Sequence, residues 1–139
     1  MGKILFSILA ALGLCSTSCA QTEEKQTPPQ EFIAMAKADS TAVLLDVRRP
    51  EEFAEGHIAG ARNLNFLDTE SFMRGISQLD RAHTYYIYCR SGGRSAKAAK
   101  QMRSKGLKVV DMKGGMLLWT ELGMPVSKET ETDNDKKVN

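Results

Sequence analysis

Three short segments rich in strand-forming side chains, separated by stretches with helical spacing, constrain the fold of this chain most strongly. The predicted strands are residues 42–45, 85–88 and 107–112. The predicted helices are residues 31–37, 68–79, 95–104 and 116–122, with a further short helix that opens at Pro50. Strands that alternate with helices at this spacing predict an α/β fold, in which a parallel sheet carries helices on both faces.

Apolar residues make up 42% of the chain, but they are unevenly distributed. Residues 21–30 contain none of them, and residues 127–139 contain only Val138. We therefore predict a folded domain over residues 31–126, a polar tether over 20–30 and a disordered polar tail over 127–139. A domain of that length can bury a core without disulfides. The composition excludes collagen-like, coiled-coil and wholly disordered chains.

The first 19 residues have the pattern of a secretory signal. Lys3 precedes eleven apolar or small residues, a run shorter than the roughly 20 that span a bilayer. The stretch Ser16-Thr17-Ser18-Cys19 resembles a bacterial lipoprotein signal, which implies a lipid on Cys19, and ordinary cleavage after Ala20 is the alternative. Both predict export, and the first predicts a periplasmic protein anchored to a membrane.

The net charge of +2 hides a strongly basic segment. Residues 81–113 contain nine Lys and Arg side chains and a single acid, Asp111. Such a segment favours an anionic partner or forms a solvated helix face. The helix predicted at 95–104 should point Ala96, Ala99 and Met102 inward, with basic side chains at 97, 100 and 103 outward. We expect no nucleic-acid partner, because no recognised binding module is present.

The predicted domain contains one cysteine, Cys89, and two histidines, His57 and His83. These three residues cannot build a structural zinc site of the common kinds, so no metal is expected. No cofactor is expected either. An exported protein with a single thiol is unusual, since oxidising compartments tend to consume unpaired cysteines.

Cys89 opens a glycine-rich loop between a predicted strand and a predicted helix. The loop reads Cys89-Arg90-Ser91-Gly92-Gly93-Arg94-Ser95. Two glycines let successive backbone N–H groups turn toward a common centre, where they form an anion cradle. A helix that begins at Ser95 adds the positive end of its dipole, and the two arginines add full charges. We expect this field to hold Cys89 as the nucleophilic thiolate; the alternative is a buried, inert cysteine.

Four stretches together resemble the rhodaneses, the thiosulfate sulfurtransferases. The loop Cys89-Arg90-Ser91-Gly92-Gly93-Arg94 looks like the active-site loop of that family. The others are Leu44-Leu45-Asp46-Val47-Arg48 with Glu51-Glu52-Phe53, then Gly56-His57-Ile58-Ala59-Gly60-Ala61, and finally Gly114-Gly115-Met116-Leu117-Leu118-Trp119. In this order they cover nearly all of residues 31–126.

The resemblance implies a single rhodanese domain that transfers sulfur through Cys89. The thiolate would attack the outer sulfur of a small anionic donor such as thiosulfate, release sulfite and become a persulfide. A thiol or a thioredoxin-like protein would then accept the sulfur. The backbone N–H groups of residues 90–95 would stabilise the sulfur anion, while Arg90 and Arg94 would hold the donor. The expected substrate-binding residues are Arg90, Ser91, Gly92, Gly93, Arg94 and Ser95.

By the same resemblance, Asp46 and Arg48 would support the loop, with Asp46 paired to a loop arginine. We expect His57 to be structural and Trp119 to be a core aromatic residue.

Two alternative functions remain open. Phosphatases and arsenate reductases of the rhodanese fold use Cys-x5-Arg, whereas Arg94 gives Cys-x4-Arg here, which favours sulfur chemistry. A sulfur carrier or thiol redox module with slow turnover is the other alternative, because exposed thiolates also serve those roles. A Ser/His/Asp hydrolase is unsupported, since no Gly-x-Ser-x-Gly stretch is present.

Overall fold

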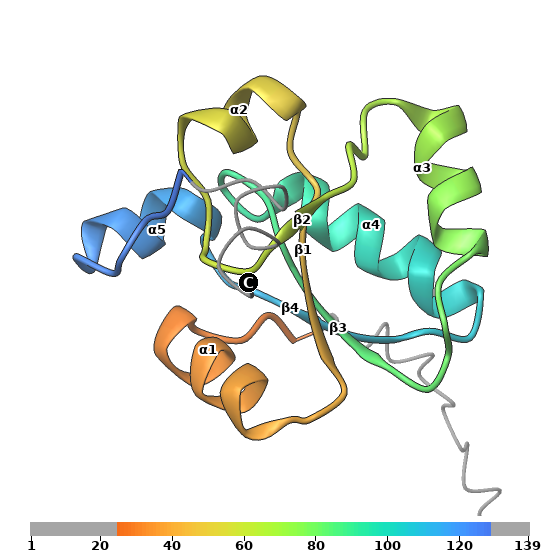
Figure 1. Ribbon diagram of the computed structural model, residues 1–139, viewed down its shortest axis with the longest axis horizontal. Coiled ribbons are helices and arrows are strands. Elements are labelled where there is room, and N and C mark those ends of the chain that lie inside the picture. The colour runs from red at the N-terminus through yellow and green to blue at the C-terminus, as the bar shows by residue number, and fades with distance from the viewer. Residues whose placement is uncertain (1–24, 129–139) are drawn as a thin grey trace, which may run out of the picture.

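The structure is a computed structural model that describes residues 25–128. Its elements follow the order α1 (Pro29–Ala38), β1 (Ala42–Asp46), α2 (Pro50–Glu55), β2 (Arg62–Asn63), α3 (Thr69–Ser77), β3 (Thr84–Tyr88), α4 (Gly93–Ser104), β4 (Lys108–Asp111) and α5 (Gly115–Glu121). The strands form one parallel sheet in the order β2-β1-β3-β4. Figure 1 shows α1 on one side of the sheet and α3 and α4 on the other. The predicted α/β class is confirmed.

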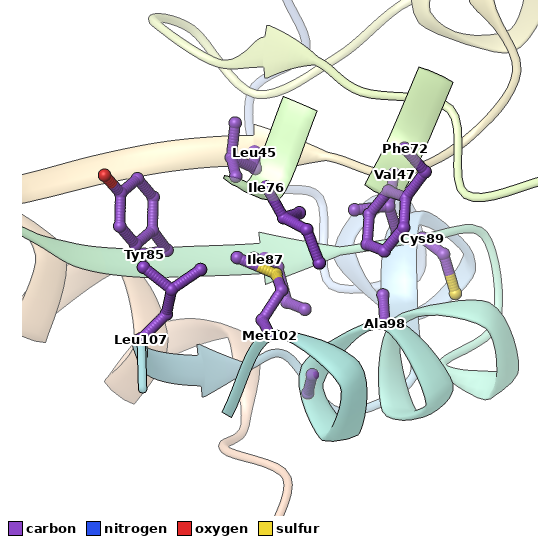
Figure 2. Packing of buried hydrophobic residues seen from close by; sticks show 11 residues of the cluster. Leu45, Val47, Phe72, Ile76, Tyr85, Ile87, Cys89, Ala98, Met102 and Leu107 are labelled. Atoms are coloured by element: carbon purple, nitrogen blue, oxygen red, sulfur yellow. The ribbon is translucent and has the colours of Figure 1, made fainter. Parts of the chain in front are cut away.

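The two faces of the sheet bury separate cores, because neighbouring residues of a strand point to opposite sides. On β3, Tyr85 and Ile87 pack in one cluster with α3 and α4, which contribute Phe72, Ile76, Ala98, Ala99 and Met102. Figure 2 shows this cluster, with Cys89 at the end of the strand. Tyr86 and Tyr88 pack in the other cluster with α1 and α5, which contribute Phe32, Ala36, Met116 and Trp119.

The strand register places the chemically important residues at one edge of the sheet. Asp46 at the end of β1 is the partner of Tyr88 at the end of β3. The residues that follow, Arg48 and Cys89, therefore lie beyond the carboxyl ends of adjacent strands. In open α/β sheets this is the edge at which ligands bind.

Two details of the predicted elements were wrong. Strand β2 was not predicted, because it has only two residues and no apolar run. In α4 the buried residues are Ser95, Ala98, Ala99 and Met102, whereas Ala96 is exposed. The buried face of α4 starts at a small polar residue, Ser95. The prediction that Ala96 points inward was therefore wrong by one residue.

The ordered domain extends beyond the predicted boundaries at both ends. Thr27 donates its N–H to the Asp111 carbonyl (2.8 Å) and accepts from the N–H of Lys113 (2.8 Å), and α1 already begins at Pro29. Residues 26–30 are therefore part of the domain and not a solvated tether. At the other end, Ser127 and His57 exchange two backbone hydrogen bonds of 2.9 and 2.8 Å, so the first residue of the predicted tail is also bound.

The signal segment, including Cys19, lies outside the described residues, as do residues 129–139. Across residues 25–128, none of the helices has both the length and the apolar character needed to cross a bilayer.

Candidate active site

The loop that follows β3 surrounds the sulfur of Cys89. The Cys89 residue is 1% exposed and lies at the end of a fully buried run of the strand. The Gly92 N–H donates to the Cys89 sulfur at 3.1 Å. Gly92 has a φ of 105°, a conformation that strongly favours glycine, and it is the residue from which α4 begins. An N–H donor in this place stabilises negative charge on the sulfur.

The start of α5 holds the first two peptides of the loop. Met116 donates its N–H to the Cys89 carbonyl (2.9 Å), and Leu117 donates to the Arg90 carbonyl (3.0 Å). The C=O and N–H of a trans peptide point in opposite directions, so the N–H groups of Arg90 and Ser91 point away from α5. Within residues 25–128 neither N–H has an acceptor, which leaves both able to bind an anion.

Glycine at position 115 makes this close contact possible. A Cβ atom at Gly115 would lie 2.4 Å from the Arg90 carbonyl carbon and oxygen and from the Cys89 carbonyl oxygen. Real Cβ atoms do not approach backbone atoms so closely. The second glycine of the last matched stretch, Gly115, is therefore needed for α5 to reach the loop.

Arg94, in the first turn of α4, forms a bidentate ion pair with Glu52 of α2. Its Nη1 and Nη2 lie 2.7 and 2.8 Å from the two carboxylate oxygens. The Arg94 hydrogen bonds lower the pKa of Glu52 to about 2. Glu52 belongs to one of the stretches that resemble rhodaneses, but its pairing with Arg94 was not predicted, because the two residues are 42 positions apart. The role of Arg94 in donor binding stays a prediction, and a donor would have to compete with Glu52 for this guanidinium.

The predicted pair between Asp46 and a loop arginine was wrong. Asp46 binds Arg48, two residues along the chain, with a closest N–O distance of 2.6 Å, and both are buried. The same Arg48 nitrogen also donates to the Gly56 carbonyl (2.7 Å). Residues two apart at a strand end share one face, so the local pair forms readily. It ties the end of β1 to the end of α2 beside the loop.

A hollow of about 250 Å³ lies against the loop. Its wall includes Arg48, Glu52, Arg90, Leu117, Thr120 and Val126. Arg90 is exposed, and within residues 25–128 it makes no ion pair. Of the two loop arginines, Arg90 is therefore the one whose charge is directly available to a small anion in the hollow.

His57 and Trp119 both have structural positions, as the sequence predicted. The His57 ring is buried, stacks on Phe53 with a centroid distance of 3.7 Å, and places Nδ1 2.8 Å from the Phe53 carbonyl. Trp119 is 1% exposed and donates its indole N–H to the Pro125 carbonyl at 2.9 Å.

No cluster of three or more His, Cys, Asp or Glu side chains in the described part of the chain is arranged to hold a metal ion.

Comparison with known proteins agrees with this geometry. Residues 28–122 match the family model of the rhodanese-like domain. The chain belongs to the rhodanese-like domain family. The family match begins at Pro28 and so includes the whole of α1, in agreement with the ordered start of the domain.

Rhodanese-like relatives are similar over most of the domain. The thiosulfate sulfurtransferase GlpE of Stutzerimonas stutzeri is 36% identical over 99 residues, which are 70% of this chain and 86% of the relative. An uncharacterized protein of Synechocystis is 31% identical over 112 residues, 78% of this chain but only 60% of that protein. The crystal structure of a rhodanese-related protein from Thermoplasma volcanium has a TM-score of 0.65 at 30% identity and covers 76% of this chain and 99% of its own. The family match and the relative named as a thiosulfate sulfurtransferase support sulfurtransferase activity of a general kind.

Proposed function

We propose that this protein is a sulfurtransferase that moves sulfur from thiosulfate, or a similar small anionic donor, to a thiophilic acceptor through a persulfide on Cys89. The observation that carries the proposal is the hydrogen bond from the Gly92 N–H to the Cys89 sulfur, in a loop that starts a helix. Relatives named as thiosulfate sulfurtransferases support the reaction class.

The proposed reaction has two steps. In the first, the Cys89 thiolate attacks the outer sulfur of the donor, the new S–S bond forms, and sulfite leaves with the electron pair of the broken bond. In the second, a thiolate or cyanide attacks the terminal sulfur and Cys89 leaves as the thiolate. The loop N–H groups stabilise negative charge on sulfur in both steps, and α5 holds in place the peptides that carry the N–H groups of Arg90 and Ser91.

Arg90 binds the anionic donor in this proposal, because it borders the hollow and is exposed. The Glu52–Arg94 pair supports sulfur chemistry over phosphate hydrolysis. A guanidinium with both terminal nitrogens already bound by a carboxylate is poorly placed to surround a tetrahedral phosphoryl group.

The test is a sulfur-transfer assay on the purified full chain with thiosulfate and cyanide, following thiocyanate. We expect turnover that Cys89→Ser abolishes, and a Cys89 adduct of one sulfur atom by mass when cyanide is omitted. An adduct without turnover supports the carrier or redox-module alternative. Hydrolysis of an aryl phosphate faster than sulfur transfer supports the phosphatase alternative, and turnover that survives Cys89→Ser overturns the mechanism.

We further propose that the protein is exported, acts in the periplasm and is held to a membrane by a lipid on Cys19. The natural acceptor would then be a reduced thiol or a thioredoxin-like protein that reaches Cys89 outside the cytoplasm. Labelling of cells with a fatty-acid analogue tests the anchor. We expect incorporation that Cys19→Ser abolishes and that the matched control Cys15→Ser leaves unchanged; labelling that survives Cys19→Ser contradicts the proposed site.

A further inference from the structure

We propose that Gln26 is a positioning residue of the active-site loop, which holds the Gly92–Gly93 peptide in the orientation that aims an N–H group at the bound anion. The inference rests on the proposed sulfurtransferase function and adds to it a residue from outside the four stretches that resemble rhodaneses.

The Gln26 side chain lies directly between two acceptors. Its Nε2 donates to the Gly92 carbonyl at 3.0 Å and to the Asp111 carboxylate at 2.8 Å. Both partners are acceptors, so the amide nitrogen, and not the amide oxygen, must face them. A Cβ atom at Gly92 would lie 3.2 Å from this nitrogen, which shows how closely the amide packs on the loop.

The backbone beside Gln26 is fixed independently of this side chain. Thr27 donates to the Asp111 carbonyl and accepts from Lys113, each at 2.8 Å, and forms a parallel bridge with Met112. Asp111 is 3% exposed at the end of β4. The segment before α1 therefore holds Gln26 beside the loop through contacts that do not involve the amide.

The bound carbonyl determines the direction of the next N–H. The Gly92 carbonyl also accepts from the Ser95 hydroxyl (3.2 Å) and the Ala96 N–H (3.1 Å), both of which lie further along α4. The Gly93 N–H therefore points the opposite way, out of the start of the helix, as the first N–H groups of helices do. No acceptor for it is found among residues 25–128.

Gln26 thus does for the fourth loop peptide what α5 does for the first two. Met116 and Leu117 hold the carbonyls of Cys89 and Arg90, and Gln26 holds the carbonyl of Gly92. Because the carbonyls of these three peptides are hydrogen-bonded, their N–H groups, which belong to Arg90, Ser91 and Gly93, remain available to bind the anion. The intervening peptide donates its N–H to the Cys89 sulfur.

The experiment compares the alkylation rates of Cys89 by iodoacetate and by iodoacetamide in the full chain. The ratio of the two rates measures how strongly the loop prefers an anionic reagent, and it requires no sulfur transfer. We expect Gln26→Leu to lower this ratio about fivefold, the change that the loss of one neutral hydrogen bond produces. Gln30→Leu makes the same change at an exposed amide on α1 and should leave the ratio unchanged. KM for thiosulfate should rise by a similar factor in Gln26→Leu.

The outcomes separate this inference from the proposed function. A lowered ratio in a chain without thiocyanate turnover supports the role of Gln26 and overturns the sulfurtransferase reaction. An unchanged ratio in folded Gln26→Leu overturns the role of Gln26, whether or not the chain turns over. If the thermal midpoint of Gln26→Leu falls below the assay temperature, Gln26→Asn decides, because its shorter amide should be unable to reach both acceptors and should lower the ratio too.

Discussion

The starts of α4 and α5 lie on either side of the same loop, and they use their N–H groups differently. Both helices begin from a glycine with positive φ, 105° at Gly92 and 74° at Gly114, and neither has a side-chain cap. The first N–H groups of α5 bind the carbonyls of Cys89 and Arg90, whereas Gly92 at the start of α4 donates to the Cys89 sulfur. The N–H groups at the start of α5 therefore fix the backbone of the loop, whereas the one at the start of α4 faces the Cys89 sulfur and is available to stabilise negative charge there.

The largest effect should come from blocking the approach of α5. Gly115→Ala places a methyl group 2.4 Å from the Cys89 and Arg90 backbone, at a left-handed φ of 57°. We expect it to destabilise the fold by about 3 kcal/mol. Sulfur transfer should fall about a hundredfold, as displacement of a catalytic group by about 1 Å can cause. Urea unfolding and thiocyanate assays measure the two effects.

Gly123→Ala is the matched control for Gly115→Ala. Gly123 also has a left-handed φ, of 70°, but a Cβ there would contact nothing within 4 Å. It should cost only about 1 kcal/mol of backbone strain and leave activity unchanged. Equal activity losses in the two variants would show that the contact between α5 and the loop is not what matters.

The next largest effect should come from removing the positive charge that the loop presents to the hollow. Arg90→Ala should raise KM for thiosulfate about tenfold with little change in kcat, since a hydrogen bond to a charged group contributes about 1.5–3 kcal/mol. Initial rates at several ionic strengths should also show a weaker salt dependence than in the wild type. Lys100→Ala, on the exposed side of α4, is the control. A larger rise of KM in Arg94→Ala than in Arg90→Ala would contradict this assignment.

A smaller effect is expected from Glu52, which joins α2 to the first turn of α4. Glu52→Gln should lower the free energy of unfolding at pH 7 by about 1 kcal/mol, because the pair is partly exposed. The pKa of Glu52 is about 2 when folded, against an ordinary value of 4.5. The stabilisation should therefore be complete above pH 4.5 and disappear as the pH falls toward 2.

Urea unfolding of Glu52→Gln and wild type between pH 7 and pH 2.5 tests this dependence, with the exposed neighbour Glu51→Gln as the control. A stability difference that stays constant down to pH 2.5 would show that the ion pair does not stabilise the fold.

The smallest effect on activity is expected at the start of α3, which has an ordinary side-chain cap. The Asp68 carboxylate accepts from the Ser71 N–H at 3.1 Å, and neither residue lines the hollow beside the loop. Asp68→Ala should cost about 1 kcal/mol of stability and leave sulfur transfer unchanged. If Asp68→Ala loses activity at a temperature where it is folded, the activity losses of the other variants would be explained by lower stability of the fold and not by their contacts with the loop.

Local patterns in the sequence were sufficient to predict most of the fold. Apolar strands at 42–45 and 85–88 and the glycine-rich loop after the second of them follow from neighbouring residues, and the structure has all three. Strand β2 could not be predicted, because two residues paired to Leu45 and Asp46 carry no periodic signal of their own.

The partners of charged residues in the site were harder to predict than the site itself. Asp46 was expected to bind a loop arginine, yet it binds Arg48, which is nearest along the chain, and Arg94 binds Glu52 instead. The sequence offers several acidic residues that could pair with each arginine near the loop, and only the three-dimensional placement of α2 determines which pairs form. Gln26 carried no signal at all, since its two acceptors are 66 and 85 residues away.

The contacts of Thr27 have a further consequence for the outer edge of the sheet. An unpaired edge strand can recruit a strand from another molecule and so begin aggregation. On β4 the Asp111 carbonyl is bound by Thr27, and the Val109 carbonyl accepts from the Arg103 guanidinium at 2.9 Å. At the opposite edge β2 is only two residues long. Both borders of the sheet are thus poor templates for a foreign strand, while the carboxyl ends of the strands carry the candidate active site.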